Sequence, residues 1–417
     1  MTAMSANKRR YFNLFILAWG SGFIYLLPYL RYQFYDPMIK AMQLADQNTL
    51  FGISMSTYGI VAMLTYFPGG WLADRVSPRK LLTVSYTVTG LVGLYFSTFP
   101  SFIMGVIVHG LWGLSTTLTF WAALMRATKD MAGEDEQGRF FGFLEGTRGL
   151  ISYLAATGVA AVFAGFTAEE EGLKWVIIIL SLGVLSAALL TWVSFKDPKE
   201  IIPNPSLTKD ILATVKLPMV WAVAFMVFAC YSAMVLIGGY ASDYLTNIVQ
   251  VSAAATGFYA AFWNYGCQFL AGPVGGTIAD KVGSRPKVSL VLYILLAASG
   301  LALFMIPADP GFKFTIIGII VLSFAAMYAI RGVYFALIED VKVPVAISGG
   351  AIGLASMIGF TPDAFMYTLA GWILDNNPGG EGYKILFGLS FGLTLIGIVA
   401  AFLVVRHVKK LKGAANV

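Results

Sequence analysis

The sequence has few charged residues, few cysteines and few histidines. Charged residues occupy 12% of its 417 positions, and there are two cysteines and two histidines. Apolar residues make up 58% of the chain, and the mean hydropathy is +0.75. A soluble domain of this length has too little polar surface to hide so much apolar material. Lipid must therefore be the solvent for much of the chain.

The scarcity of polar residues also excludes several kinds of site. Cys230 and Cys267 both fall inside apolar runs, where a disulfide framework is not expected. The sequence holds no metal-spaced Cys/His set, nucleophile elbow, Walker loop or dinucleotide fingerprint. We expect no metal, no cofactor and no enzymatic activity. Any work that the protein does must then be driven by a gradient of substrate or ion.

A short polar stretch occurs twice, once in each half of the chain. Residues 69–80 read GGWLADRVSPRK, and residues 275–287 read GGTIADKVGSRPK. Each copy has an Asp four residues after the second Gly, a base next, and an Arg five residues after the Asp. The residues of this pattern are Gly70, Asp74, Arg75, Arg79, Gly276, Asp280, Lys281 and Arg285. Because each copy ends one long apolar run and begins another, the repeat indicates two copies of one membrane module.

Counting apolar runs of about 20 residues predicts twelve membrane-spanning helices. In the first half they lie near 12–36, 50–72, 79–98, 102–127, 139–165 and 173–194. In the second half they lie near 218–240, 253–279, 286–307, 313–338, 346–373 and 384–405. The expected fold is an all-α membrane protein with two pseudo-symmetric six-helix bundles. These are residues 1–194 and 218–417, joined by a charged cytoplasmic linker over 195–217.

The basic residues predict the orientation. With the N-terminus inside, 20 of the 28 Lys and Arg fall on cytoplasmic segments and four on the opposite side. An even number of spans returns the C-terminus to the cytoplasm, so we expect a multi-pass protein of the inner membrane with both termini cytoplasmic. The net charge of +6 is thus a topology signal, and no nucleic-acid partner is expected. The remaining four arginines fall inside predicted spans: Arg31, Arg126, Arg148 and Arg331.

Twelve helices in two halves, a polar central linker and the doubled Gly-Asp-Arg stretch together resemble the major facilitator superfamily. Residues 69–80 look like that superfamily's loop between helices 2 and 3, with Ser77 and Pro78 where Gly and Arg are usual. The resemblance implies substrate translocation by alternating access, with a site near the bilayer midplane between the halves. Tyr29-Leu30-Arg31 adds a partial similarity to the organophosphate antiporter branch, although 218–240 lacks that branch's helix 7 Arg.

Electrostatic arguments also predict that the repeated loop acts as a gate. An Asp at the cytoplasmic end of a helix can pair with nearby bases and with the N-terminal dipole of a helix in the other half. We expect Gly70 and Gly276 to permit close helix contact, so that the loops latch the cytoplasmic side shut. The alternative is a solvated turn whose charges set the topology.

Two of the intramembrane arginines are the main candidates for substrate ligands. Arg31 lies close to Pro28 on helix 1. Its side chain is expected to face a cavity, and the alternatives are that it snorkels to the interface or pairs with Asp36. Arg331 is predicted to lie within a helix that continues past it. The resemblance places helices 1, 4, 7 and 10 around the cavity, which adds Arg126 on helix 4, unless that residue marks the helix end beside Lys129.

Further candidates depend on their partners. Glu145 and Arg148 share one helix face and either form an ion pair or leave Glu145 as a proton-coupling acid. Asp363 is an alternative coupling acid, or a partner of Arg331 or Arg148. His109 titrates near physiological pH, although a packed hydrogen-bonding role is the alternative. Tyr328 is an aromatic candidate for the pocket wall, with ordinary packing as its alternative.

Two functions follow from these charges. Four arginines against Glu145 and Asp363 leave a surplus of two positive charges, which favours a secondary transporter of a small organic anion. The substrate would be a carboxylate, sugar acid or phosphate ester, with protons or another ion as candidates for coupling. A proton-coupled exporter of neutral or cationic compounds is the second function, and it requires Glu145 or Asp363 to be unpaired. In either case the protein is expected to work as a monomer.

Overall fold

The computed structural model describes residues 6–132, 136–196, 213–344 and 347–414, and every regular element among them is helical. The first half contains α1 (Ala6–Ile24), α2 (Arg31–Ala41), α3 (Asn48–Ala73), α4 (Pro78–Phe96), α5 (Phe102–Thr116), η1 (Thr117–Trp121), α6 (Ala122–Met131), α7 (Gln137–Ala164) and α8 (Glu169–Ser194). The predicted linker 195–217 falls mostly on residues 197–212, which lie outside the described residues.

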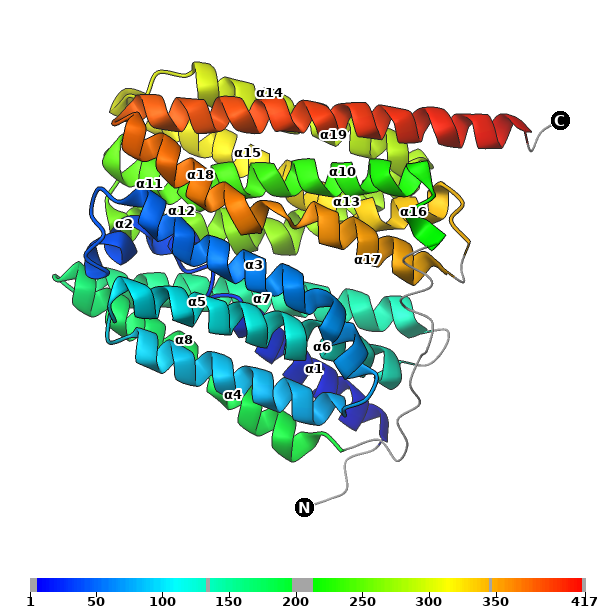
Figure 1. Cartoon of the computed structure of the whole chain (residues 1–417), viewed down its shortest axis with the longest axis horizontal. Helices are drawn as coiled ribbons and strands as arrows, with labels where there is room; N and C mark the ends of the chain where they lie inside the picture. The colour runs from blue at the N-terminus through cyan, green and yellow to red at the C-terminus, as the bar shows by residue number, and fades with distance from the viewer. Residues whose placement is uncertain (1–5, 133–135, 197–212, 345–346, 415–417) are drawn as a thin grey trace. The chain divides into compact units, whose positions relative to one another are not determined.

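The second half begins with α10 (Pro218–Ala233), η3 (Met234–Gly238), α11 (Gly239–Asn247), α12 (Ala253–Ala261), η4 (Phe262–Gly266) and α13 (Cys267–Val282). It continues with α14 (Arg285–Met305), η5 (Pro310–Phe312), α15 (Lys313–Arg331), η6 (Tyr334–Ala336), α16 (Leu337–Asp340), α17 (Ser348–Gly359), α18 (Pro362–Asn376) and α19 (Gly380–Ala414). Grouped by the turns between them, the helices of both halves make the twelve predicted membrane-spanning segments in two six-helix bundles (Figure 1).

Eight of the twelve segments are single stretches long and apolar enough to span a bilayer, counted within the described residues. Two of the other four are broken. The first segment divides into α1 and α2 around Pro28, because a proline cannot donate the helical hydrogen bond. The eleventh divides into α17 and α18 just before Pro362. The last two, α4 and α12 with η4 and α13, are less apolar.

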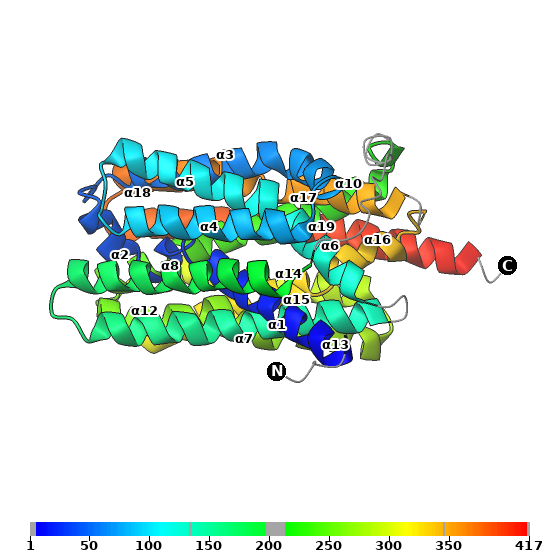
Figure 2. The ribbon, with the colours of Figure 1, turned by 90° about the horizontal axis from the view of Figure 1, so that it is seen from below.

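The chain forms two compact units. Unit 1 comprises Met1–Ala45, Ile53–Pro203 and Ala253–Phe269, and unit 2 comprises Asp46–Gly52, Asn204–Ser252 and Leu270–Val417. In unit 1, α4 packs along α8, and in unit 2, α14 packs along α19, as both views show (Figures 1 and 2). The division at residues 195–217 stays a prediction.

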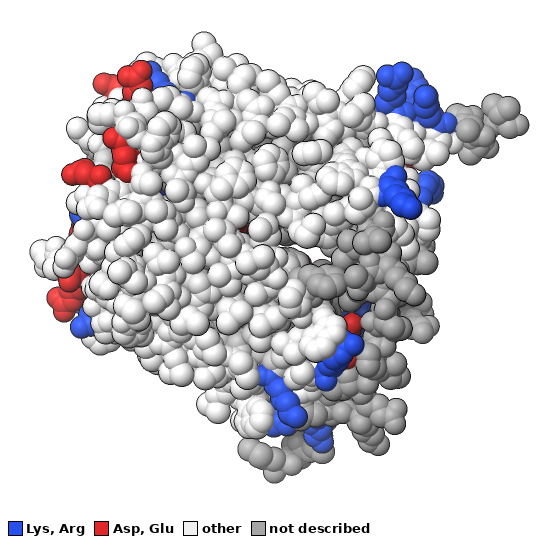
Figure 3. All heavy atoms as spheres, viewed as in Figure 1, with Lys and Arg blue, Asp and Glu red and all other residues white. Residues whose placement is uncertain are grey.

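Apolar side chains cover much of the surface. Val193 is 72% exposed, Ile103 70% and Phe314 72%, which is stable only where the surrounding solvent is lipid. On the face that Figure 3 shows, the exposed charges gather near the ends of the helices. Figure 3 shows Lys and Arg gathered where α19 ends, Asp and Glu where α19 begins, and an almost uncharged band between them on that face of unit 2.

Candidate functional site

Arg31 is buried inside unit 1. It is the first residue of α2, directly after the turn that contains Pro28, and its side chain is 1% exposed. Its Cζ lies 4.8 Å from the centre of the Tyr35 ring, a cation–π contact. The side chain therefore does not snorkel to the interface. Asp36, the predicted alternative partner, forms a salt bridge with Lys40 at 2.6 Å.

Arg331 lies at the end of α15, which corrects the prediction of a helix that continues past it. The next residue, Gly332, packs directly against α13, where an added Cβ would lie 2.5 Å from the carbonyl oxygen of Gly272. After Gly332 the chain turns and re-forms only short helical pieces, η6 and α16. Glycine both permits the close approach and weakens helix propagation at this point.

The guanidinium of Arg331 has no ion-pair partner among the described residues. Its Nη1 lies 3.5 Å from the Met234 sulfur, and its Cζ lies 5.5 Å from the centre of the Tyr328 ring. The predicted pair with Asp363 is not formed, because that carboxylate instead accepts a hydrogen bond of 2.9 Å from the Tyr231 hydroxyl. Unit 2 thus holds a cation in a span without a carboxylate beside it.

The other two intramembrane arginines have partners. Arg148 pairs with Glu145 at 2.8 Å on one face of α7, and its Cζ lies 6.0 Å from the Trp121 ring. Arg126 forms a salt bridge with Asp130 at 3.5 Å and donates a hydrogen bond to the Ala73 carbonyl oxygen. The structure therefore places Arg126 at the end of α6 against the loop after α3.

His109 is packed inside unit 1. It is 1% exposed, its Nδ1 lies 2.8 Å from the Gly105 carbonyl oxygen, and its ring contacts Phe96 and Trp112 edge-on. This is the packed hydrogen-bonding alternative that the sequence left open.

The first copy of the repeated loop is fixed to its neighbours by bases and aromatic rings. Arg75 lies 4.2 Å above the Trp71 ring, and Arg79 donates to the Trp192 carbonyl oxygen at 3.0 Å. Ser77 caps α4 by accepting from the Lys80 amide. Burial raises the pKa of Asp74 above its ordinary value, and the charges of Arg126 and Arg75 oppose that rise.

In the second copy, a base of the loop pairs with acids on a neighbouring helix. Arg285, the first residue of α14, pairs with Glu339 at 3.1 Å and with Asp340 at 3.7 Å, both on α16. Asp280 and Lys281 lie in the last turn of α13. The helix is followed by Gly283, whose φ of +65° is a left-handed conformation that glycine adopts without strain. Each loop is therefore held to the end of helix 4 or helix 10 of its own half.

The predicted role of Gly276 in close helix contact is wrong for this structure, and its neighbour has that role. A Cβ on Gly276 would meet nothing within 4 Å, whereas a Cβ on Gly275 would lie 2.6 Å from the Ala329 carbonyl oxygen. In the first copy, likewise, a Cβ on Gly69 would lie 2.7 Å from the Thr117 carbonyl oxygen. The first glycine of each pair makes the close contact because it faces helix 4 or helix 10.

Sequence reasoning missed two features. Met234 and Trp121, which contact Arg331 and Arg148, belong to π-helical turns, a distortion frequent at functional sites. Asp375 of α18 accepts four hydrogen bonds of 2.5–3.0 Å from the amides and side chains of Asn48 and Thr49, so it caps α3. No local pattern signals a cap supplied from more than 300 residues away.

Comparison with known proteins identifies the family. The model of the Major Facilitator Superfamily matches residues 12–241. The chain belongs to the major facilitator superfamily. It is 31% identical to the inner membrane protein YqcE of Escherichia coli over 95% of this chain and 94% of that one, and 29% identical to YihN of the same organism over 97% and 98%. It is thus a multi-pass membrane transporter of small molecules and not an enzyme.

More distant proteins also match over most of their length. A sodium-dependent phosphate transport protein of Oryctolagus cuniculus is 23% identical over 84% of this chain and 78% of its own. The solved structure of a bacterial homologue of the human lysosomal transporter Spinster, inward-facing and unoccupied, superposes with a TM-score of 0.77 at 14% identity. It covers 97% of this chain and 99% of that one. At such identity the likeness shows the fold alone.

Proposed function

We propose that this superfamily member is a secondary active transporter that moves a small organic anion across the inner membrane by alternating access. The observation that carries the proposal is the guanidinium of Arg331, which lies in a span with no carboxylate partner among the described residues. A charge in a span is costly unless it is compensated. An anion that arrives and leaves would compensate it once in every transport cycle.

Arg331 suits such a ligand better than a lysine would. A guanidinium presents a planar fork that matches a carboxylate or a phosphate with two parallel hydrogen bonds. Tyr328 and Met234 beside it leave that fork without a competing carboxylate. Arg31, buried at the first turn of α2, is the candidate ligand of unit 1, where the positive end of a helix adds to the attraction for an anion.

The second function, a proton-coupled exporter of neutral or cationic compounds, is less well supported because both predicted coupling acids have partners. Glu145 is ion-paired with Arg148, and Asp363 accepts a hydrogen bond from Tyr231. The name of the rabbit relative, a phosphate transport protein, agrees with an anionic substrate. Within the anion class, phosphate esters are disfavoured because α10, η3 and α11 contain no arginine.

We further propose that the loops at 69–80 and 275–287 form the gate of the cytoplasmic side and that the protein works as a monomer. The gate proposal is supported by the fixed loop contacts of Arg75, Arg79 and Arg285. Arg79 ties the first loop to the end of α8 and Arg285 ties the second to α16, so a movement of those helices would pull on the loops.

Anion binding by purified protein tests the ligand role of Arg331. Arg331→Ala should weaken binding of the preferred carboxylate, sugar acid or phosphate ester about ten- to a hundredfold, since a hydrogen bond to a charged group contributes about 1.5–3 kcal/mol. Arg331→Lys should lose almost as much, because lysine keeps the charge but not the fork. Lys313→Ala, at the exposed start of the same helix, is the matched control and should bind normally.

Stability distinguishes a lost ligand from a damaged fold. Arg331→Ala removes no ion pair within the described residues, so the variant should melt at or above the wild-type temperature. Unchanged anion affinity in a well-folded Arg331→Ala protein would remove Arg331 from the site.

A further inference from the structure

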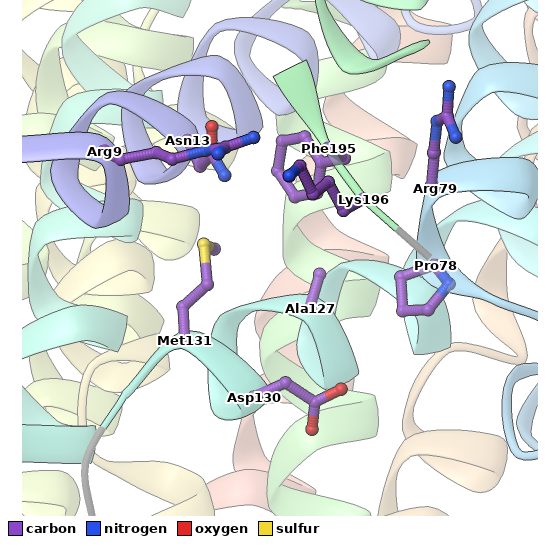
Figure 4. A pocket seen from close by; sticks show the side chains of 9 residues that line it. All are labelled: Arg9, Asn13, Pro78, Arg79, Ala127, Asp130, Met131, Phe195 and Lys196. Atoms are coloured by element: carbon purple, nitrogen blue, oxygen red, sulfur yellow. The ribbon is translucent and has the colours of Figure 1, made fainter. Parts of the chain in front are cut away.

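A cavity lies within unit 1, lined by residues near the ends of its helices. Its volume is about 270 Å³, and residues from four segments line it (Figure 4). The segments are the start of α1, the start of α4, the end of α6 and the residues that follow α8. The lining residues are Arg9, Asn13, Pro78, Arg79, Ala127, Asp130, Met131, Phe195 and Lys196.

The cavity carries a surplus of positive charge. Arg9, Arg79 and Lys196 bring three cations from three segments, against the single carboxylate of Asp130. That carboxylate is already engaged with Arg126, at 3.5 Å. Figure 4 shows the side chains of Arg9 and Lys196 pointing toward one another across the cavity. Two like charges directed at one space repel each other, and an anion between them would offset that repulsion.

A buried polar atom in the wall has no partner. The Oδ1 atom of Asn13 is inaccessible to solvent and makes no hydrogen bond with any described residue. A buried amide oxygen without a donor is costly, and most such groups in proteins are satisfied. A ligand with a hydroxyl group would satisfy this oxygen. Rotation of the amide would instead aim its NH₂ at a phosphate.

The surroundings of the cavity are those of a membrane interface. The Arg79 guanidinium lies 4.1 Å above the Trp192 ring, and tryptophan is enriched where lipid headgroups meet the acyl region. On the last turns of α8, Leu189 is 66% exposed and Val193 72%. Phe12 of α1, between the lining residues Arg9 and Asn13 in the sequence, is 45% exposed. Acyl chains would thus have apolar surface to cover beside the cations.

We propose that this cavity binds the glycerophosphate headgroup of an anionic phospholipid from the cytoplasmic leaflet. The phosphate would lie between Arg9 and Lys196, with Arg79 beside it, and a glycerol hydroxyl would donate to Asn13. Basic pockets between transmembrane helices on the cytoplasmic side are suited to such headgroups. A soluble anion shares the phosphate chemistry, but it has no acyl chains to cover the apolar surface of α1 and α8.

Lipid retention by the full chain tests the proposal. Purified protein is equilibrated in micelles with equal amounts of phosphatidylglycerol and phosphatidylcholine, and retained lipid is counted by native mass spectrometry. The wild type should keep phosphatidylglycerol in preference. Arg9→Gln with Lys196→Gln should reduce that retention roughly thirtyfold, because each base near an anionic lipid contributes about fivefold. Asn13→Leu should reduce it less while keeping every charge.

The matched control removes two bases elsewhere. Lys409→Gln with Lys410→Gln, on the exposed end of α19, changes the net charge equally and should keep wild-type retention. If the double cavity variant folds poorly, Lys196→Gln alone, beyond the end of α8, should still lose about fivefold. Equal retention in the cavity variants and the control would overturn the proposal. Displacement of the lipid by an equal concentration of glycerol 1-phosphate would overturn it too, in favour of a soluble anion.

Discussion

At the residue scale, the intramembrane arginines divide by how their charge is compensated. Arg148 has the carboxylate of Glu145 at 2.8 Å, and Arg126 has that of Asp130 at 3.5 Å. Arg331 has a sulfur atom and an aromatic ring instead. Since a permanent ion pair neutralises a charge and a substrate does so only while bound, this division separates structural arginines from the proposed ligand.

Asp74 supplies a prediction at the same scale. Burial raises its pKa above the ordinary 3.8, so the folded protein holds this proton more tightly than the unfolded chain does. Below pH 3.8, the ordinary pKa, the protonated acid contributes its full stability. That contribution is lost as the pH rises through the raised pKa of the folded protein. Asp74→Asn should therefore flatten the fall of melting temperature with rising pH over this window. Parallel melting curves for the two proteins would contradict the burial of this acid.

The same variant tests the proposed gate. Loss of the Asp74 charge removes its attraction to Arg126 and Arg75. Turnover in reconstituted vesicles should therefore slow, with a smaller effect on substrate binding. Equal turnover in Asp74→Asn and wild type would show a loop that does not gate.

Some of these residue contacts could be predicted from sequence and others could not. The Glu145–Arg148 pair follows from a spacing of three on one helix, because i and i+3 side chains are neighbours. The partner of Asp363, by contrast, is Tyr231, 132 positions away, and no local spacing selects it. Charge and periodicity show which residues need a partner, while tertiary packing decides which one they receive.

At the element scale, close packing at the first glycine of each repeated pair predicts a contrast between neighbours. Gly275→Ala places a Cβ 2.6 Å from the Ala329 carbonyl oxygen, so the helices must separate, with an expected loss of about 1–3 kcal/mol. Gly276→Ala meets nothing and should be neutral or stabilise α13 by about 0.5–1 kcal/mol, since alanine favours helix. Melting temperatures of the two variants in one detergent provide the measurement.

The order of the two melting temperatures shows which glycine makes the close helix contact. Gly275→Ala melting above Gly276→Ala would contradict the close contact between α13 and α15. Gly69→Ala offers a repetition in the first half, since its Cβ would lie 2.7 Å from the Thr117 carbonyl oxygen.

The helices themselves were largely predictable, and their interruptions only partly so. The break between α1 and α2 lies at Pro28, where proline removes a helical hydrogen bond, although the sequence predicted one span there. The end of α15 at Arg331 was missed, since its cause is the close approach of Gly332 to α13 and not a strong local stop signal. The π-helical turns η1, η3 and η4 also have no sequence pattern of their own.

At the scale of the whole molecule, the charges at the helix ends predict the orientation. In unit 1, Arg9 and Arg79 donate to carbonyl oxygens at the end of α8, while Glu169, Glu170 and Glu171 begin that helix. Because cytoplasmic segments are rich in bases, the end of α8 should face the cytoplasm. The fold follows from such averages over many residues, which is why the sequence predicts it better than it predicts the site, and the orientation stays a prediction.

Cysteine labelling of intact cells checks this orientation. Both native cysteines are buried, so the background should be low. Lys410→Cys should react with a membrane-impermeant maleimide only after permeabilisation, and Glu170→Cys should react from outside. Labelling of Lys410→Cys in sealed cells would reverse the topology and place the termini outside.

The most direct test of the central claim is transport by purified protein in sealed vesicles. Uptake of a panel of carboxylates, sugar acids and phosphate esters is compared with uptake of neutral and cationic compounds. Wild type should accumulate at least one anion, and Lys313→Ala should match it. Arg331→Ala and Arg331→Lys should both transport that anion about ten- to a hundredfold more slowly. Transport confined to neutral or cationic compounds, or anion uptake that survives in Arg331→Ala, would contradict the account.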